Sequence, residues 1–165
     1  MKTSLLFFAI LLMGTRLQAG ERLDSLFGNE EAQAVVAKPT KVQAYRLPEE
    51  TTKKTVKDYK MIAGPVAIDD ALAKSLGQLL LDEKSYSWDT GKACDPLYGV
   101  RLEFIQGEKT TDVFFCFSCD ILAVYVNGKS VGSADFDAMR PHLVKIMQRI
   151  FPDDKAIQGL KARKK

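Results

Sequence analysis

Apolar residues recur at helical spacing in two parts of the chain. Between residues 68 and 80 they are mostly three or four positions apart and share one stripe of a helix: Ile68, Leu72, Leu76, Leu79 and Leu80. Asp69 precedes this stripe, where its carboxylate can accept hydrogen bonds from the first free amides of the helix. Gly77, inside the same helix, indicates that another segment approaches it closely. Residues 138–151 carry a second stripe, with Asp137 as the expected cap, so the pattern predicts two main helices.

Alternation of apolar and polar residues begins at Tyr98 and indicates β-strands. Leu102 and Phe104 alternate with Arg101 and Glu103, so one face of this strand is expected to be buried and the other to face solvent. The two charged side chains on the solvent face are interpreted as a solubilising pair rather than as catalytic groups.

Two turn signals divide the residues that follow into hairpins. Gly107-Glu108 is the first, and Asn127-Gly128 is the second and stronger one, because a type I′ turn needs positive φ at both positions. With Gly107 and Glu108 as the two turn residues, positions equally far before and after them lie opposite each other in the sheet. Further strands are expected over 110–117, 121–126 and 129–134.

Helices separated along the chain from a run of antiparallel strands are typical of the α+β class. We therefore expect an antiparallel four-stranded meander packed against two main helices as a two-layer sandwich. Short apolar stretches at 41–47 and 61–63 could extend the sheet by one or two N-terminal strands, and Gly64-Pro65 is expected to end the second of them. Residues 48–60, rich in Glu, Thr and Lys, are expected to form an exposed excursion.

The N-terminus has the three-part pattern of a cleaved secretory signal. Lys2 is followed by the apolar run Leu5–Met13 and by a polar stretch that ends at Ala19. The apolar run is too short to cross a bilayer, which takes about twenty residues. We expect residues 1–19 to be removed and the mature chain to be exported, as a periplasmic or secreted protein. The mature chain is then divided into a flexible N-terminal arm (20–40), a single α+β domain (41–160) and a basic tail (161–165).

The charge balance of the mature chain argues against a polyanionic partner. The full chain has 24 Lys and Arg against 21 Asp and Glu, and cleavage removes Lys2 and Arg16, which leaves 22 basic side chains. A nearly neutral chain has no long-range field to attract nucleic acid, so no nucleic-acid partner is expected. The tail Lys161–Lys165 is basic, and we interpret it as a solubility feature rather than a membrane-binding segment. No transmembrane segment is expected after cleavage.

Three cysteines are expected to gather at one end of the sheet. The hairpin register places Cys116 opposite Gly99 and Cys119 opposite Pro96, with Cys94 two residues further on. In an oxidising compartment, nearby cysteines ordinarily form a disulfide. We expect a structural bridge from Cys94 to Cys119, ahead of Cys94 to Cys116. The third thiol is then expected to be buried among the phenylalanines of the neighbouring strand: Phe114, Phe115 and Phe117.

A metal site and a redox site are the alternatives for these cysteines. Three thiolates and His142, the one histidine of the chain, would make a chemically proper tetrahedral zinc shell. Cys116-Phe117-Ser118-Cys119 also has the spacing of a redox pair, but it leads into another strand instead of the helix N-terminus that lowers a thiol pKa. Both readings rank below the disulfide, and no cofactor is expected.

The sequence favours a binding or interaction module over an enzyme. It contains no glycine-rich phosphate loop, no calcium-binding loop and no nucleophile elbow. Tyr86, Trp88 and Tyr98 flank the loop that carries Cys94 and could line a recognition surface. The expected partner is another protein or an envelope component, met by the open sheet face or by the Trp88–Cys94 loop. The alternative class is a metal-binding or thiol-redox protein centred on the three cysteines.

Overall fold

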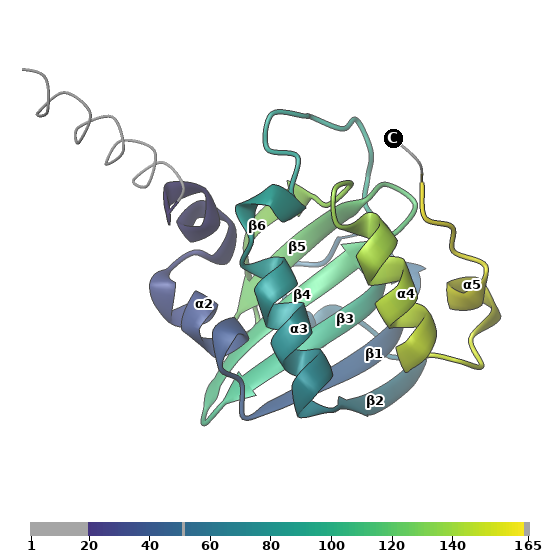
Figure 1. Ribbon diagram of the computed structural model, residues 1–165, viewed down its shortest axis with the longest axis horizontal. Coiled ribbons are helices and arrows are strands. Elements are labelled where there is room, and N and C mark those ends of the chain that lie inside the picture. Colours follow the sequence, from purple (N-terminus) through teal and green to yellow (C-terminus); the bar gives the residue numbers. More distant parts are fainter. Residues whose placement is uncertain (1–19, 51, 164–165) are drawn as a thin grey trace, which may run out of the picture.

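Six antiparallel strands form one sheet, and helices lie across one of its faces (Figure 1). The computed structural model describes residues 20–50 and 52–163, so the predicted signal peptide at 1–19 and the last two residues of the tail lie outside the described residues. The strands follow the order β2-β1-β3-β4-β5-β6 across the sheet. They are β1 (Lys41–Glu50), β2 (Ala63–Ile68), β3 (Tyr98–Gln106), β4 (Lys109–Cys116), β5 (Ile121–Val126) and β6 (Lys129–Asp135).

The predicted meander corresponds to β3–β6, and both N-terminal strands extend it beside β3. The register of the first hairpin is confirmed, because Val100 lies opposite Phe115 and Gln106 lies opposite Lys109. The second hairpin turn is confirmed as well, since Asn127 and Gly128 both have positive φ. Pro65 does not end β2 but lies within it. An edge strand tolerates proline because one of its sides needs no ladder hydrogen bond.

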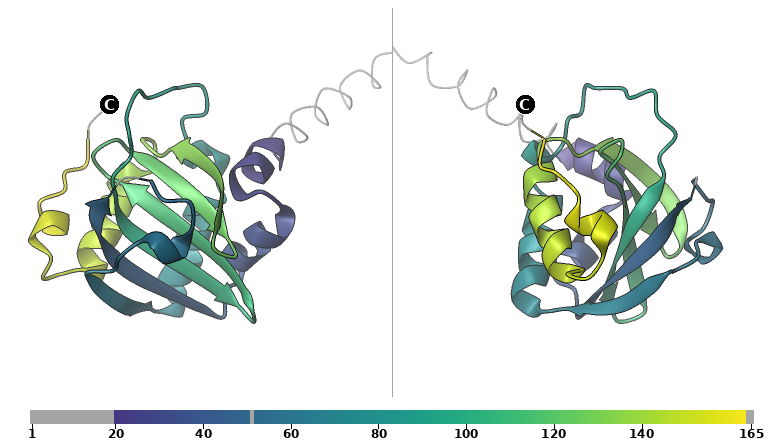
Figure 2. Two further views of the ribbon diagram at one scale, coloured as in Figure 1. Left: turned by 180° about the vertical axis from the view of Figure 1, so that it is seen from behind. Right: turned by 90° about the vertical axis from the view of Figure 1, so that its right-hand side faces the viewer.

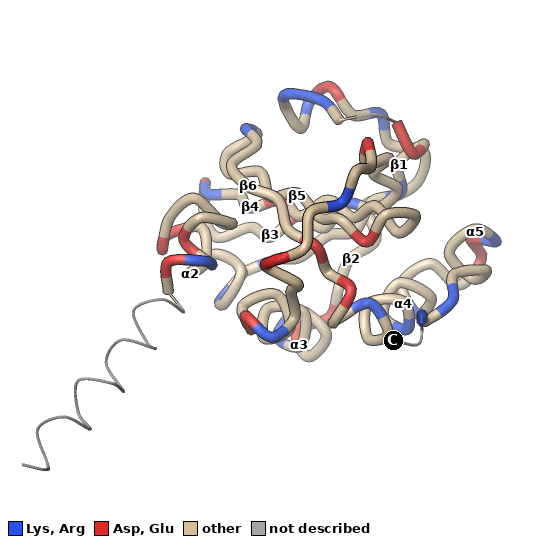
Figure 3. Tube along the Cα trace, turned by 90° about the horizontal axis from the view of Figure 1, so that it is seen from above, with Lys and Arg blue, Asp and Glu red and all other residues tan. Residues whose placement is uncertain are grey.

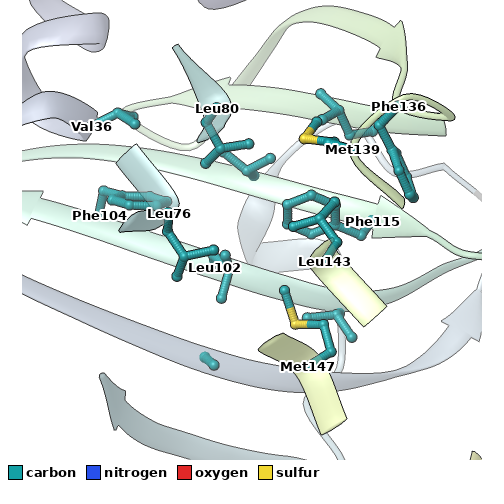
Figure 4. Packing of buried hydrophobic residues seen from close by; sticks show 14 of the residues in the cluster. Val36, Leu76, Leu80, Leu102, Phe104, Phe115, Phe136, Met139, Leu143 and Met147 are labelled. Carbon is teal, nitrogen blue, oxygen red and sulfur yellow. The ribbon is translucent and has the colours of Figure 1, made fainter. Parts of the chain in front are cut away.

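The main core lies between the sheet and the helices α2 (Glu30–Ala37), α3 (Asp70–Leu80) and α4 (Arg140–Ile150). Figure 4 shows apolar side chains of α3 and α4 packed onto strands β3 and β4: Leu76, Leu80, Leu143, Met147, Leu102, Phe104 and Phe115. All seven are completely buried. Burial of one such side chain contributes about 1.5–3 kcal/mol, so this interface is the principal source of stability. The short helix α5 (Lys155–Gln158) follows α4.

The N-terminal segment is packed, which differs from the flexible arm expected over 20–40. Residues 20–27 are helical, and α2 follows with Val35 and Val36 buried in the main core. Asn29 caps α2 by accepting a hydrogen bond from the amide of Ala32 at 2.8 Å. The close approach indicated by Gly77 is the contact between α2 and α3, because a Cβ at Gly77 would lie 2.6 Å from the backbone oxygen of Val36.

The start of α4 also differs from the sequence expectation. The helix begins at Arg140, and its N-cap position is Met139, which makes no side-chain cap hydrogen bond. Asp137 therefore does not cap this helix and instead forms an ion pair with Lys92. The expected cap of the first helix is confirmed, since Asp69 accepts a hydrogen bond from the Leu72 amide at 2.8 Å.

The sheet face opposite the helices is partly covered by residues 52–62, which include the short helix η1 (Val56–Asp58) (Figure 2). Tyr59 from this segment is buried and packs against Tyr98, Phe114 and Tyr125. The prediction of an exposed excursion over 48–60 holds for most of its described residues, which are exposed or half-buried, but not for Tyr59, which supplies one ring of a second apolar cluster.

The contact between α2 and α3 can be tested at Gly77. In an exposed helix, Gly→Ala stabilises by about 1 kcal/mol. We expect Gly77→Ala to lower the free energy of unfolding by about 1–3 kcal/mol instead, because the new methyl group forces α2 away from α3. Urea denaturation measures the difference. The control Gly91→Ala adds a Cβ with no neighbour within 4 Å and should change stability by less than about 0.5 kcal/mol. A stabilised Gly77→Ala variant would show that α2 does not pack there.

Candidate functional site

Two carboxylates face each other on the sheet surface opposite the helices. Glu103 of β3 and Asp112 of β4 are direct cross-strand partners. Like charges in this arrangement repel, so the pair needs a cation nearby. Arg101 lies two residues before Glu103 on the same face of β3 and supplies that cation.

Arg101 bridges the two carboxylates through separate nitrogen atoms. Its Nε donates to Oδ1 of Asp112 at 2.7 Å, and its Nη2 donates to Oε1 of Glu103 at 2.6 Å. Tyr45 of β1 donates its hydroxyl to Oε2 of Glu103 at 2.8 Å, and the Arg101 guanidinium lies 4.7 Å from the centre of the Tyr45 ring. We call these four residues, Tyr45, Arg101, Glu103 and Asp112, the Arg101 network.

The Arg101 network is buried, and burial changes its protonation chemistry. Arg101 is 6% exposed and Asp112 is 1% exposed. Burial raises the pKa of Asp112 to about 6, against the opposing effect of Arg101 and with a further increase from the nearby Glu103 charge. The pKa of Tyr45 is raised to about 12, first by burial and then by its hydrogen bond to Glu103. Asp112 is thus mainly ionised at neutral pH and half-protonated near pH 6.

An open pocket of about 490 Å³ adjoins the network. Arg101, Glu103 and Asp112 contribute polar groups to it, and the other residues that line it are Val56, Lys57, Tyr59, Met61, Glu108, Thr110, Asn127 and Gly128. Met61 stands at its rim and is 52% exposed. These lining residues include no cysteine, serine or histidine, and they offer groups for ion pairing, hydrogen bonding and apolar contact.

This site was not predicted from the sequence. The interpretation of Arg101 and Glu103 as an exposed solubilising pair is wrong, because Arg101 is buried and Tyr45 and Asp112 form hydrogen bonds with the pair. The signal that could have found the site is the hairpin register. It places Asp112 opposite Glu103, and Arg101 diagonally across from Asp112. That pattern of one cation between two facing carboxylates is distinctive.

The three cysteines do lie near one another, at the turn between β4 and β5. Cys94 and Cys119 are at disulfide distance, with Cα atoms 6.4 Å apart, within the range of natural bridges. Cys116 is a free, buried thiol. It packs in the second apolar cluster with Phe114, but Phe115 and Phe117 belong to the main core on the other face. Alternation along the strand explains this separation.

The structure does not assemble the zinc shell considered from the sequence. Cys94 and Cys119 are bridged, Cys116 lies under the second cluster, and His142 is exposed on α4. Among the described residues, no group of three His, Cys, Asp or Glu side chains is arranged to hold a metal ion.

The three aromatic residues near the Cys94 loop do not form one surface. Tyr86 is buried and donates its hydroxyl to the Leu80 carbonyl at 2.5 Å, while Trp88 donates Nε1 to the Glu83 carbonyl at 2.9 Å. Both pack on the helix side of the sheet, whereas Tyr98 belongs to the second cluster. Of the three, only Trp88 retains partial exposure.

The described part of the basic tail is attached to the domain. Arg163 lies 3.3 Å from the completely buried carboxylate of Asp120 and donates to the Ser118 carbonyl at 3.2 Å. Elsewhere, acidic and basic residues are interspersed along most of the described chain (Figure 3).

None of the family models, curated proteins or solved structures compared with the chain matches it. Among the described residues, no helix has the length and apolar character that a membrane-spanning segment requires. The functional assignment therefore depends on the geometry of the site.

The arrangement of the three cysteines predicts which two are linked and which one is protected from modification. Non-reducing peptide mapping should recover Cys94 linked to Cys119, and iodoacetamide should modify Cys116 only after unfolding, because that thiol is buried. Cys94→Ala should lower the free energy of unfolding by about 2–4 kcal/mol, the usual contribution of a disulfide. A linked Cys94–Cys116 peptide, or three reactive thiols in the native protein, would contradict this arrangement.

The buried carboxyl of Asp112 predicts an unusual titration. Carbon-13 NMR of its carboxyl group should give a midpoint near pH 6, and Glu103→Gln should lower that pKa because it removes a like charge. Since the pKa in the folded protein lies above the ordinary 3.8, this group makes the fold less stable as the pH rises from about 4 to 6. Asp112→Asn should remove that part of the pH dependence. A midpoint near 4 would show that the carboxyl is solvated.

Proposed function

We propose that this chain is an exported, non-catalytic binding domain and that its ligand site is the pocket beside the Arg101 network. The observation that carries this proposal is Asp112, a carboxylate that is almost completely buried and yet lines an open pocket. A buried ion network is rarely needed for stability, since apolar residues of the same volume often serve as well. Perturbed carboxyl groups in clefts are characteristic of functional sites.

Binding fits the pocket better than catalysis. The carboxylate of Glu103 is engaged by Arg101 and Tyr45, so both of its oxygens have hydrogen-bond donors. The lining residues include no histidine, the side chain that most often serves as a general base, and no serine or cysteine nucleophile. Val56, Tyr59 and Met61 add an apolar wall next to the charged groups, which is the usual composition of a ligand site.

Export is supported by the pattern of residues 1–19 and by the bridge between Cys94 and Cys119, because disulfides persist in oxidising compartments. The partner is another protein or an envelope component, reached through the sheet face that the helices of this two-layer α+β domain leave free. The nearly balanced charge supports neither nucleic acid nor an anionic surface as the partner.

One contact favours a second candidate, a thiol-based activity. The hydroxyl of Ser118 lies 3.1 Å from Sγ of Cys116 and 3.9 Å from Sγ of Cys119. A free thiol thus lies close to a bridge with which it could exchange. Burial of Cys116 and the absence of a helix N-terminus at this position argue against a reactive thiolate.

Site-specific photo-crosslinking tests the binding proposal. With a benzophenone amino acid at Met61, on the pocket rim, we expect a discrete adduct with the native partner in the intact envelope. The same group at Lys74 on α3, or at Asp89 in the exposed loop, should give none. Asp112→Asn in the Met61 background should abolish the adduct, because it removes the charge of the site while keeping the shape of the side chain.

Two results would contradict the proposal. Equal crosslinking from Lys74 would show that the adducts are unspecific. A discrete adduct from Asp89 alone would place the docking surface on the Trp88–Cys94 loop.

A further inference from the structure

The Arg101 network leaves one acceptor unused. Oδ1 of Asp112 accepts from Arg101, whereas Oδ2 has no hydrogen-bond donor among the described residues. This oxygen belongs to a side chain that is 1% exposed and that lines the pocket. A buried carboxylate with a free lone pair favours a ligand that can donate to it.

The charged residues that line the pocket determine which charge the ligand should carry. Three carboxylates and two cations line it: Glu103, Glu108, Asp112, Lys57 and Arg101. The guanidinium of Arg101 is already engaged by two carboxylates, so it has little attraction left for an anion. The pocket therefore has an unneutralised negative charge directed at its occupant.

The apolar residues that line the pocket indicate that the rest of the ligand is apolar. Val56, Tyr59 and the exposed Met61 line the same pocket as the charged residues, so they can contact the apolar part of a ligand whose charged end meets Asp112. The hydroxyl of Tyr59 is occupied by the Lys53 amide at 2.8 Å and by Tyr125, so its ring offers apolar contact.

We propose that this pocket binds a primary ammonium group carried on a short alkyl chain, with Asp112 as its counter-ion and Tyr59 and Met61 along its stem. This inference rests on the proposed function and names the chemistry of the ligand. A free amine and a lysine side chain of a protein partner share this chemistry.

Ion pairing with Asp112 makes the binding dependent on pH. The groups that surround this carboxyl are Arg101 and Glu103 on β3, Tyr125 opposite it on β5, Lys57 on η1 and Glu108 in the hairpin turn. Because the pKa of Asp112 is about 6 in the unoccupied protein, protonation competes with the ammonium group below that pH. Affinity should fall about tenfold between pH 7.5 and pH 5.

Nitrogen-15 NMR titration tests the inference with five compounds. Pentylammonium at pH 7.5 should shift the amide signals of Thr110 and Asn127, and pentanol and pentanoate should not. The tripeptide Gly-Lys-Gly distinguishes the lysine source, with Gly-norleucine-Gly as its control of equal stem length. If pentylammonium binds and Gly-Lys-Gly does not, the source is a free amine.

Two variants test whether pentylammonium binds at Asp112. Asp112→Asn should weaken pentylammonium binding at least tenfold and remove its pH dependence, while Asp89→Asn, in a distant exposed loop, should leave both unchanged. If Asp112→Asn fails to fold, the pH dependence of the wild-type protein decides alone: equal affinity at pH 5 and pH 7.5 overturns the inference.

Different experimental outcomes would overturn the ammonium assignment and the proposed binding function. Pentanoate binding in place of pentylammonium, or no probe binding while the Met61 crosslink persists, overturns the ammonium assignment and leaves the binding site in place. Loss of both the probe shifts and the crosslink overturns both.

Discussion

The sheet face opposite the helices depends on one interaction: the guanidinium of Arg101 lies between two facing carboxylates. Glu103 and Asp112 lie directly opposite each other, and their repulsion is relieved because Arg101 donates to both. Removing Arg101 would leave the buried carboxylate of Asp112 and the half-buried one of Glu103 without a cation, which costs several kcal/mol. The network also depends on the strand register, since a slip of β4 by one residue would turn Asp112 toward the main core and away from Arg101 and Glu103.

The second apolar cluster determines how deeply this network is buried. Tyr59 is carried across the sheet by residues 52–62 and packs on Phe114, 4.6 Å between ring centres. The hydroxyl of Tyr125 holds the same segment by donating to the Lys53 carbonyl at 2.7 Å. The segment covers the middle of the face and leaves the pocket open beside it. Asp112, under such partial cover, still lines the pocket while losing most of its hydration, which is the physical origin of its raised pKa.

Local signals in the sequence were sufficient for much of the fold and for little of the site. The turn at Asn127-Gly128, the cap at Asp69 and the hairpin register depend on residues close in sequence, and each is confirmed. The packing of α2 and the cover formed by Tyr59 depend on contacts between distant segments, which no local pattern reports. Arg101 was assigned to solvent for the same reason: alternation shows which residues share a face, but not what covers that face.

The domain has a second buried ion pair, between Arg140 of α4 and Asp120, which is separate from the Arg101 network. Asp120 is completely buried with positive φ at the β4–β5 turn, where Arg140 of α4 pairs with it and donates to the Phe117 carbonyl at 2.7 Å. The neighbouring Cys119 ties the same turn to the Cys94 loop. Helix, turn and loop are therefore joined without any contribution from the Arg101 network. Because the main core and these links stabilise the domain, the domain tolerates the free-energy cost of burying the charged Arg101 network on the other face.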